Sequence, residues 1–97
     1  MSGTSVIDLL RDVITRRVEL EFKFVGVSIC LRPHVLYDSR NGALTLGGVV
    51  TNTGIFTNVP VNQIQDVVVT GRAFQPDPSF NRRYANYHNP HAIIKSP

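Results

Sequence analysis

The first apolar residues of the chain recur at the spacing of an amphipathic helix. The i, i+3, i+4, i+7, i+8 pattern, which places one apolar stripe against a core, is formed by Val6, Leu9, Leu10, Val13 and Ile14. Ser5 can cap the N-terminus, and Asp8 in the first turn and Arg16 in the last turn complement the helix dipole. We therefore predict a helix from about Val6 to Arg17.

After residue 18 the apolar positions change to a period of two. Residues 19–24 read Glu-Leu-Glu-Phe-Lys-Phe and alternate strictly, which predicts a half-buried strand. Glu19 and Glu21 share its polar face. We expect that face to be solvated, and we do not expect the two carboxylates to form a general acid–base pair.

Further apolar runs, each bounded by turn residues, predict four more strands. They cover residues 27–37, 43–51, 55–61 and 63–71. Pro33 cannot donate to a ladder, so it marks an edge, a bulge or the end of the pairing in the first of these strands. Gly47–Gly48 indicates a sharp bend or a close backbone approach, and Val67–Val69 fits a buried strand.

One helix followed by five short strands predicts a mainly β fold with an N-terminal α-helix. We expect a small, strongly bent, five-stranded β-barrel, because closure of a sheet removes its exposed edges. From residue 75 onward Pro and Asn become frequent, which indicates an irregular C-terminal tail. We therefore divide the chain into a helix-plus-barrel domain over residues 1–74 and a Pro- and Asn-rich basic tail over residues 75–97.

The composition limits the classes of protein to consider. With 97 residues the chain can form one modest core but not a cleft between two domains. No apolar run approaches the roughly 20 residues of a membrane helix, and the single Cys excludes an internal disulfide. Because no signal region precedes the predicted helix, we expect a cytoplasmic protein with no membrane partner.

The formal charge of +3 is distributed unevenly along the chain. Residues 1–70 are neutral, whereas residues 71–97 carry the whole excess. Arg82, Arg83 and Tyr84 place cations beside an aromatic ring, a combination that suits single-stranded nucleic acid. The alternative is that the aromatic residues of this segment pack on the domain or meet a second copy, while the arginines are only solvated.

No group of residues indicates catalysis. Cys30 and His34 are four residues apart on one predicted strand, about 13 Å at roughly 3.3 Å per residue, so we expect no thiol–imidazole pair. His88 and His91 have no further ligand near them in sequence, so we expect no metal. The glycines lack the spacing of a phosphate-binding loop. We expect a binding protein and not an enzyme, with no catalytic residue and no cofactor.

The order of these elements resembles that of the WYL-domain family of bacteria. The resemblance is carried by residues 10–17, 18–24, 32–36, 42–46, 59–64 and 72–74. Residues 10–17 and 18–24 look like the family's leading helix and first strand, and residues 32–36 and 42–46 look like its Pro-containing second strand and its name-giving strand. Residues 59–64 look like the Phe-Arg-Leu-Asp-Arg-Ile segment, and residues 72–74 with the Pro-rich stretch after them resemble the end of short, stand-alone members. The resemblance implies a short, stand-alone member with a small Sm-like, SH3-type barrel. It also implies a ligand-sensing or nucleic-acid-binding regulatory module.

The chain departs from the family where the ligand would bind. The Trp-Tyr-Leu signature is absent near Ala43–Thr45, and Pro60 and Gln63 align with basic residues of the family. In the family those basic residues are expected to hold a negatively charged ligand. The scaffold is therefore retained better than the site.

We interpret the chain as a non-enzymatic regulatory or accessory domain that binds a ligand, a nucleotide or a single-stranded nucleic acid. The competing interpretation is a self-associating assembly module, a homo-oligomer such as a dimer or a protein-partner module, with a degenerate ligand site. A thiol enzyme that uses Cys30 is a minor alternative. The candidate ligand or nucleic-acid residues are Arg32, His34, Arg40, Gln63, Arg72, Arg82, Arg83 and Tyr84.

Overall fold

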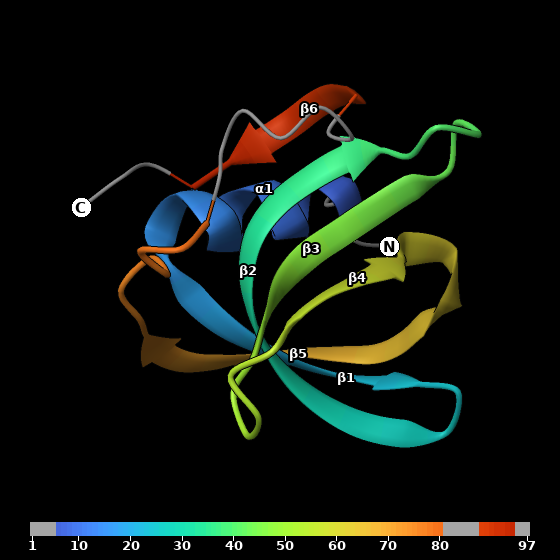
Figure 1. Cartoon of the computed structure of the whole chain (residues 1–97). Helices are drawn as coiled ribbons and strands as arrows, with labels where there is room; N and C mark the ends of the chain where they lie inside the picture. The colour runs from blue at the N-terminus through green and yellow to red at the C-terminus, as the bar shows by residue number, and fades with distance from the viewer. Residues whose placement is uncertain (1–5, 81–87, 95–97) are drawn as a thin grey trace.

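The computed structural model describes residues 6–80 and 88–94 of the chain. These residues form two helical elements and six strands (Figure 1): α1 (Val6–Arg16), β1 (Val18–Phe24), β2 (Val27–Asp38), β3 (Leu44–Val50), β4 (Phe56–Pro60), the 3-10 helix η1 (Val61–Gln63), β5 (Ile64–Ala73) and β6 (His88–Ile93). The predicted mainly β fold with a leading helix is confirmed.

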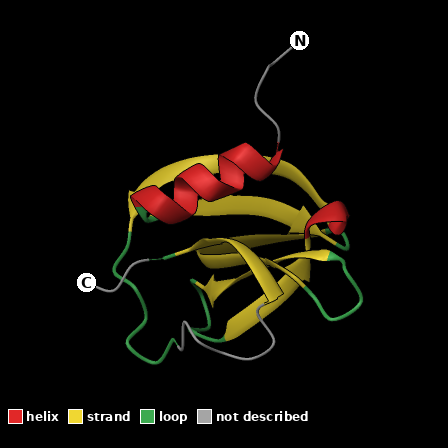
Figure 2. Ribbon diagram, turned by 90° about the horizontal axis from the view of Figure 1, so that it is seen from above, coloured by secondary structure: helices red, strands yellow, loops and turns green. Residues whose placement is uncertain are grey.

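The helix α1 forms where the apolar stripe predicts it. Leu10, Val13 and Ile14 are buried, while most other side chains of the helix are exposed. The buried stripe packs against β2, β6 and β1, and Figure 2 shows the helix lying across the strands. The helix ends at Arg16 because Arg17 adopts a positive φ of 58° and redirects the chain into β1.

The strands form one antiparallel sheet in the order β4-β3-β2-β1-β5, with β6 added beside β2. The sheet curls strongly (Figure 1). Within the described residues no ladder joins β4 to β5, so the sheet is not closed into the expected barrel. The strand β4 is only five residues long and ends at Pro60, which has no N–H to donate, and η1 then turns the chain directly into β5.

Part of the segment predicted to be an irregular tail is a strand. Residues 74–80 have neither helix nor strand, but β6 pairs with residues 35–38 of β2. The reason is the length of β2, which has 12 residues against the seven of its neighbour β1. The second half of β2 would otherwise have an open edge, and β6 satisfies its backbone groups.

The strand β5 lies at the edge of the sheet and is not the buried strand that its valines predict. Among the described strands it pairs with β1 alone, and two register shifts interrupt that ladder. Val68 is 53% exposed and Val69 is 40% exposed. The valine run has the composition of an interior strand, but the open sheet provides no second neighbour to cover it.

The strand β2 contains a bulge at His34, next to the proline that indicates an irregularity. Pro33 pairs with Gly48 and the residue after His34 pairs with Gly47, so His34 is an extra residue with no partner in β3. The predicted close backbone approach is present at Gly48, where a Cβ atom would lie 2.3 Å from the carbonyl oxygen of Arg32. The two glycines therefore allow β3 to follow the bulged strand.

The hydrophobic core lies between α1 and the sheet. Its members come from α1, from β1 to β4, and from the residues that follow β5 and β6: Leu10, Val13, Ile14, Val18, Leu20, Phe22, Leu31, Leu36, Leu46, Val59, Phe74 and Ile94. Residues near the C-terminus thus complete a core whose other members come from the first 60 residues.

We expect Gly48→Ala to destabilise the protein more than Gly42→Ala does. The methyl group at residue 48 meets the backbone of β2, and overpacking of this kind costs about 1–3 kcal/mol or more. At Gly42 a methyl group meets no atom within 4 Å, and only the positive φ of 85° opposes it, at a cost of roughly 1 kcal/mol. Urea unfolding of both variants measures the difference, and equal losses would contradict the tight contact at the bulge.

Candidate functional site

A pocket of about 340 Å³ lies beside the bulge in β2. Its lining comes from three parts of the chain: Arg32 and His34 of β2, Val49 and Gly54 in β3 and the turn that follows it, and the segment Gln75–Pro78. The last segment follows β5 and returns to β2. The pocket therefore depends on a contact between residues that are about 40 positions apart in the sequence.

The imidazole of His34 holds this returning segment against β2. The side chain is fully buried, Nδ1 lies 2.7 Å from the carbonyl oxygen of Arg32, and the backbone N–H of Asp77 donates to Nε2 over 2.9 Å. Because a carbonyl oxygen can only accept, Nδ1 carries the proton and Nε2 is the acceptor. His34 is therefore neutral, and both ring nitrogens have partners.

Aromatic rings enclose the imidazole. The ring of Phe74 stacks on it with a centroid distance of 5.4 Å, and Phe80 and Phe56 approach it edge-on at 5.1 Å and 6.0 Å. Phe56 and Phe80 also stack on each other at 5.6 Å. The rings keep water away from the imidazole, so its charged form lacks the hydration it would have in solution.

Burial is the main reason that the pKa of His34 lies below its ordinary value of 6.5. The carbonyl oxygen of Arg32 and the charge of Asp77 act in the opposite direction, and the charge of Arg32 lowers the pKa further. A base whose pKa is lowered on folding contributes stability that is fully present at pH values above its pKa in the unfolded chain. This contribution is lost as the pH falls below 6.5 toward the pKa of the folded protein.

Arg32 and Asp77 bring opposite charges to the pocket. Asp77 accepts the backbone N–H of Ser79 through Oδ1 over 2.9 Å, so the carboxylate is held by its own turn. The half-buried Arg32 forms no side-chain hydrogen bond or ion pair within residues 6–80 and 88–94. An unpaired guanidinium at a pocket is suited to a carboxylate or a phosphate.

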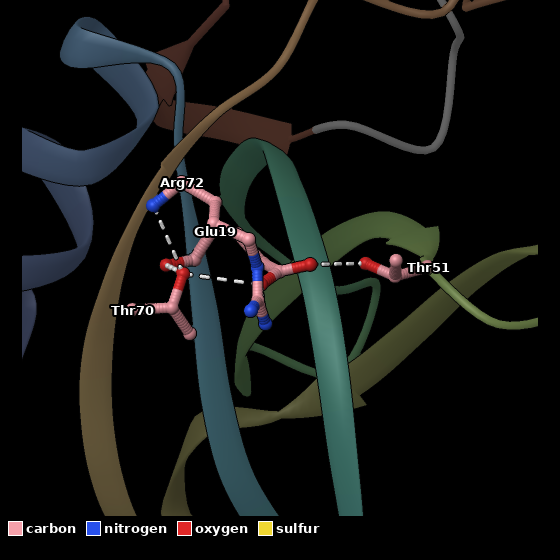
Figure 3. Close-up of polar contacts among 4 residues, drawn as sticks. All are labelled: Glu19, Thr51, Thr70 and Arg72. Carbon is pink, nitrogen blue, oxygen red and sulfur yellow. Dashed lines mark hydrogen bonds and ion pairs between the residues drawn. The ribbon is translucent and has the colours of Figure 1, made fainter.

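A second polar cluster surrounds Glu19 on β1 (Figure 3). The hydroxyl of Thr51 donates to Oε2 over 2.6 Å, while Thr70 and Nε of Arg72 donate to Oε1 over 3.0 Å and 2.7 Å. Thr51 follows β3, whereas Thr70 and Arg72 lie on β5, so the carboxylate joins both sides of the sheet. Glu19 is only 3% exposed, and the prediction of a solvated position is wrong because these side chains cover it.

The hydrogen bonds determine the charge state of Glu19. Burial alone would raise its pKa, but the donors from Thr51, Arg72 and Thr70, together with the charge of Arg72, hold the pKa below the ordinary 4.5. The carboxylate is therefore ionised near neutral pH. Its interactions stabilise the fold above pH 4.5, and this stabilisation is lost as the pH falls toward the pKa of the folded protein.

The structure brings Arg32 and His34 together at the pocket, and Arg40, Gln63 and Arg72 do not line it. Arg40 is exposed in the turn between β2 and β3, and Gln63 is exposed in η1. Arg72 is bound to Glu19. The remaining predicted site residues, Arg82, Arg83 and Tyr84, lie outside the described residues.

The described residues contain no preformed metal site. Among them, no group of three or more His, Cys, Asp or Glu side chains could hold an ion. The described histidine of β6, His91, contacts Asp38 over 3.1 Å. Cys30 is a half-buried free cysteine, while the ring nitrogens of His34 are bonded to Arg32 and Asp77. No helix in the described part of the chain is long and apolar enough to cross a membrane.

Sequence reasoning missed Val49, Gly54 and the segment Gln75–Pro78 as parts of the pocket. The residues Asp-Pro-Ser after Pro76 indicate a local turn. They carry no signal that the turn returns to β2. Arg32 and His34 were among the predicted site residues, and both lie in residues 32–36, which resemble the Pro-containing second strand of the WYL-domain family.

Comparison with family models and with curated proteins finds no match to the chain. A solved structure does match: proteasome accessory factor B/C (PafBC) of Arthrobacter aurescens, with 18% sequence identity and a TM-score of 0.66. The matched region is 76% of this chain but only 13% of the PafBC chain. At this identity the likeness shows the fold alone. Because PafBC is a WYL-domain protein, the likeness supports a WYL-like fold.

We expect Glu19→Gln to lower the free energy of unfolding by about 1–3 kcal/mol near neutral pH, because the carboxylate loses its charge-assisted hydrogen bonds. The difference from wild type should shrink below pH 4.5, where protonation weakens the same bonds in the wild-type protein. Urea unfolding at about pH 7 and about pH 3 measures it. Glu21→Gln, an exposed change on the same strand, is the control, and an equal loss in both variants would contradict the role of Glu19.

Proposed function

We propose that the chain is a non-enzymatic regulatory or accessory domain that binds an anionic ligand, a nucleotide or a single-stranded nucleic acid, in the pocket beside β2. The observation that carries the proposal is the guanidinium of Arg32. Arg32 lines the pocket, and its side chain has no hydrogen bond or ion pair within the described residues. A bound phosphate or carboxylate would supply that partner.

The size and lining of the pocket favour a small ligand or one unit of a longer one. Its volume of about 340 Å³ lies at the lower end of the roughly 300–1,000 Å³ of ligand pockets. Val49, Pro76 and Pro78 give it apolar walls, which suit the flat face of a base. A single strand would place one nucleotide in the pocket and continue over the surface.

The scaffold supports the same class of function. The resemblance to WYL domains implies a ligand-sensing or nucleic-acid-binding module, and the likeness to PafBC supports the scaffold. The chain spans only 13% of PafBC. The proposal therefore concerns the binding role of one domain. Arg32 of its pocket lies in the segment that resembles the Pro-containing second strand of WYL domains.

The pocket has the chemistry of a binding site and not of a catalytic one. The lone pair of His34 Nε2 already accepts the N–H of Asp77, and Nδ1–H is directed to a carbonyl oxygen. The imidazole therefore offers no free lone pair to a substrate while the contact with the Asp77 backbone is in place. The carboxylate of Glu19 is likewise occupied by four hydrogen-bond or ion-pair contacts from three side chains.

A second candidate function, self-association, is favoured by the edge strand β5. Val68 and Val69 are exposed there, and Val27 at the end of the adjoining β1–β2 hairpin is 60% exposed. An exposed apolar edge strand is a surface on which a second copy can add its own strand. The register shifts against β1 and the positive φ of Asp66 weaken this edge as a template, so we place this function second.

Arg32→Gln should weaken the binding of AMP and of a short single-stranded oligonucleotide by about tenfold or more, because charge-assisted hydrogen bonds to the anion are lost. Calorimetry with AMP and fluorescence anisotropy with the labelled strand, both at low salt, measure the two affinities. The affinity for the strand should also fall steeply as salt is added.

Arg40→Gln is the matched control for net charge, because Arg40 is exposed in a turn that does not line the pocket. A double variant, Arg82→Ala with Arg83→Ala, reports the contribution of the basic C-terminal segment to the salt dependence. Equal weakening by Arg32→Gln and Arg40→Gln, or no binding by the wild-type protein at low salt, would contradict a site at Arg32.

For the second candidate function, light scattering of the wild-type protein should show a dimer or a larger species that Val68→Lys returns to a monomer. A lysine on an edge strand disfavours pairing with another chain, and an exposed position tolerates it with little change in stability. A monomeric wild-type mass across the concentration range would exclude self-association through β5.

A further inference from the structure

We propose that His34 is a proton switch for the pocket, and that proton uptake releases the returning segment Gln75–Pro78 from its backbone contact and strengthens anion binding. The proposal deepens the proposed function, because it assigns a means of regulation to the same pocket. It is carried by the position of one imidazole: the ring is fully buried, lines the pocket and holds the backbone of Asp77.

The hydrogen-bond partners of the ring fit only the neutral imidazole that carries its proton on Nδ1. Nδ1–H donates to the carbonyl oxygen of Arg32, and Nε2 accepts the N–H of Asp77. When a proton adds to Nε2, that nitrogen becomes a donor facing another donor. The contact with the Asp77 backbone must then break, while the bond from Nδ1 to Arg32 remains.

A new partner for the protonated nitrogen is close by. The carboxylate of Asp77 belongs to the same residue, and its charge already acts on His34. Exchange of the backbone N–H for this carboxylate reorients Asp77 within a segment that has neither helix nor strand, and it competes with the contact between Oδ1 and the backbone N–H of Ser79. The imidazolium is then held by a charge-assisted hydrogen bond.

The groups around His34 define the switch. Its own strand contributes the Arg32 guanidinium, and the returning segment contributes Asp77. The other neighbours of His34 within the described residues are uncharged: the rings of Phe56, Phe74 and Phe80, and the backbone N–H of Ile94, which donates to the carbonyl oxygen of His34 over 2.7 Å. Among the charged side chains of the described residues, those of Arg32 and Asp77 act on the ring.

Proton uptake changes the charge of the pocket. When His34 is neutral, the opposite charges of Arg32 and Asp77 cancel, and the pocket lining carries no net charge. With His34 protonated, the lining carries one net positive charge, and Asp77 is engaged by the imidazolium. An anion then binds more tightly, and by linkage a bound anion favours proton uptake by the same factor. Burial places the transition below pH 6.5.

The switch is tested first without a ligand, by NMR of the full chain titrated from about pH 8 to about pH 4.5. The backbone amide of Asp77 should shift with the same midpoint as the ring of His34, below 6.5. The amide of Gly42, which donates to Ser39 in a distant turn, is the internal reference. An Asp77 amide with no midpoint in this range would overturn the proposal.

Three variants separate His34 from other titrating groups. In His34→Gln the side chain retains a donor and an acceptor but cannot titrate, so the Asp77 midpoint should vanish. In His91→Gln the midpoint should persist. Asp77→Asn keeps the backbone N–H and removes the charge that raises the pKa of His34, so the His34 midpoint should move to lower pH. This third variant tests the switch even if His34→Gln does not fold.

The coupling to the pocket is tested with sulfate, whose charge is constant over the range. Its affinity, measured by calorimetry, should rise about threefold or more between pH 7 and pH 5.5, within the usual range of coupling free energies. The rise should be absent in His34→Gln. Sulfate binding that depends on Arg32 but not on pH would overturn the switch and leave the binding site intact. An Asp77 amide that titrates in a protein that binds no sulfate would overturn the proposed function and leave the proton switch intact.

Discussion

The extra residue in β2 is the constraint on which the rest of the structure depends. Because His34 has no partner in β3, its side chain turns into the interior and its carbonyl oxygen becomes available to Ile94. The imidazole then fixes the segment after β5, and the carbonyl fixes the end of β6. One irregularity in one strand therefore positions two later segments of the chain, and Gly47–Gly48 make it sterically possible.

Two polar clusters perform similar tasks on different parts of the sheet. Glu19 joins β1 to β5 and to the residue after β3, and His34 joins β2 to the segment that lines the pocket. Neither cluster leaves a buried polar side-chain atom without a partner within the described residues. They differ in the state of their arginines, since Arg72 is engaged by Glu19 whereas the side chain of Arg32 has no hydrogen bond or ion pair within the described residues. Both clusters thus join segments of the sheet by side-chain hydrogen bonds in addition to the strand ladders.

The local elements were predictable because their signals are local. The stripe of α1, the alternation of β1, and the proline and glycine pair at the bulge each follow from neighbouring residues. Three features depend on contacts between distant residues and gave no such signal. They are the exposure of β5, the pairing of β6 with β2, and the burial of Glu19 under side chains from β5 and from the residue after β3. For the site, Arg32 and His34 were predicted, but the wall that Gln75–Pro78 provide was not.

The pairing of β6 has a consequence for the order in which the molecule assembles. Its partner in β2 lies about 55 residues earlier in the sequence. The paired residues of β1 and β5 are separated by about 40 to 55 residues. Ladders between such distant segments form slowly, because a long loop must close first. As the chain leaves the ribosome, the imidazole of His34 stays in water until Asp77 and the later strand have emerged. The pocket is therefore among the last features to form, because its wall includes Gln75–Pro78.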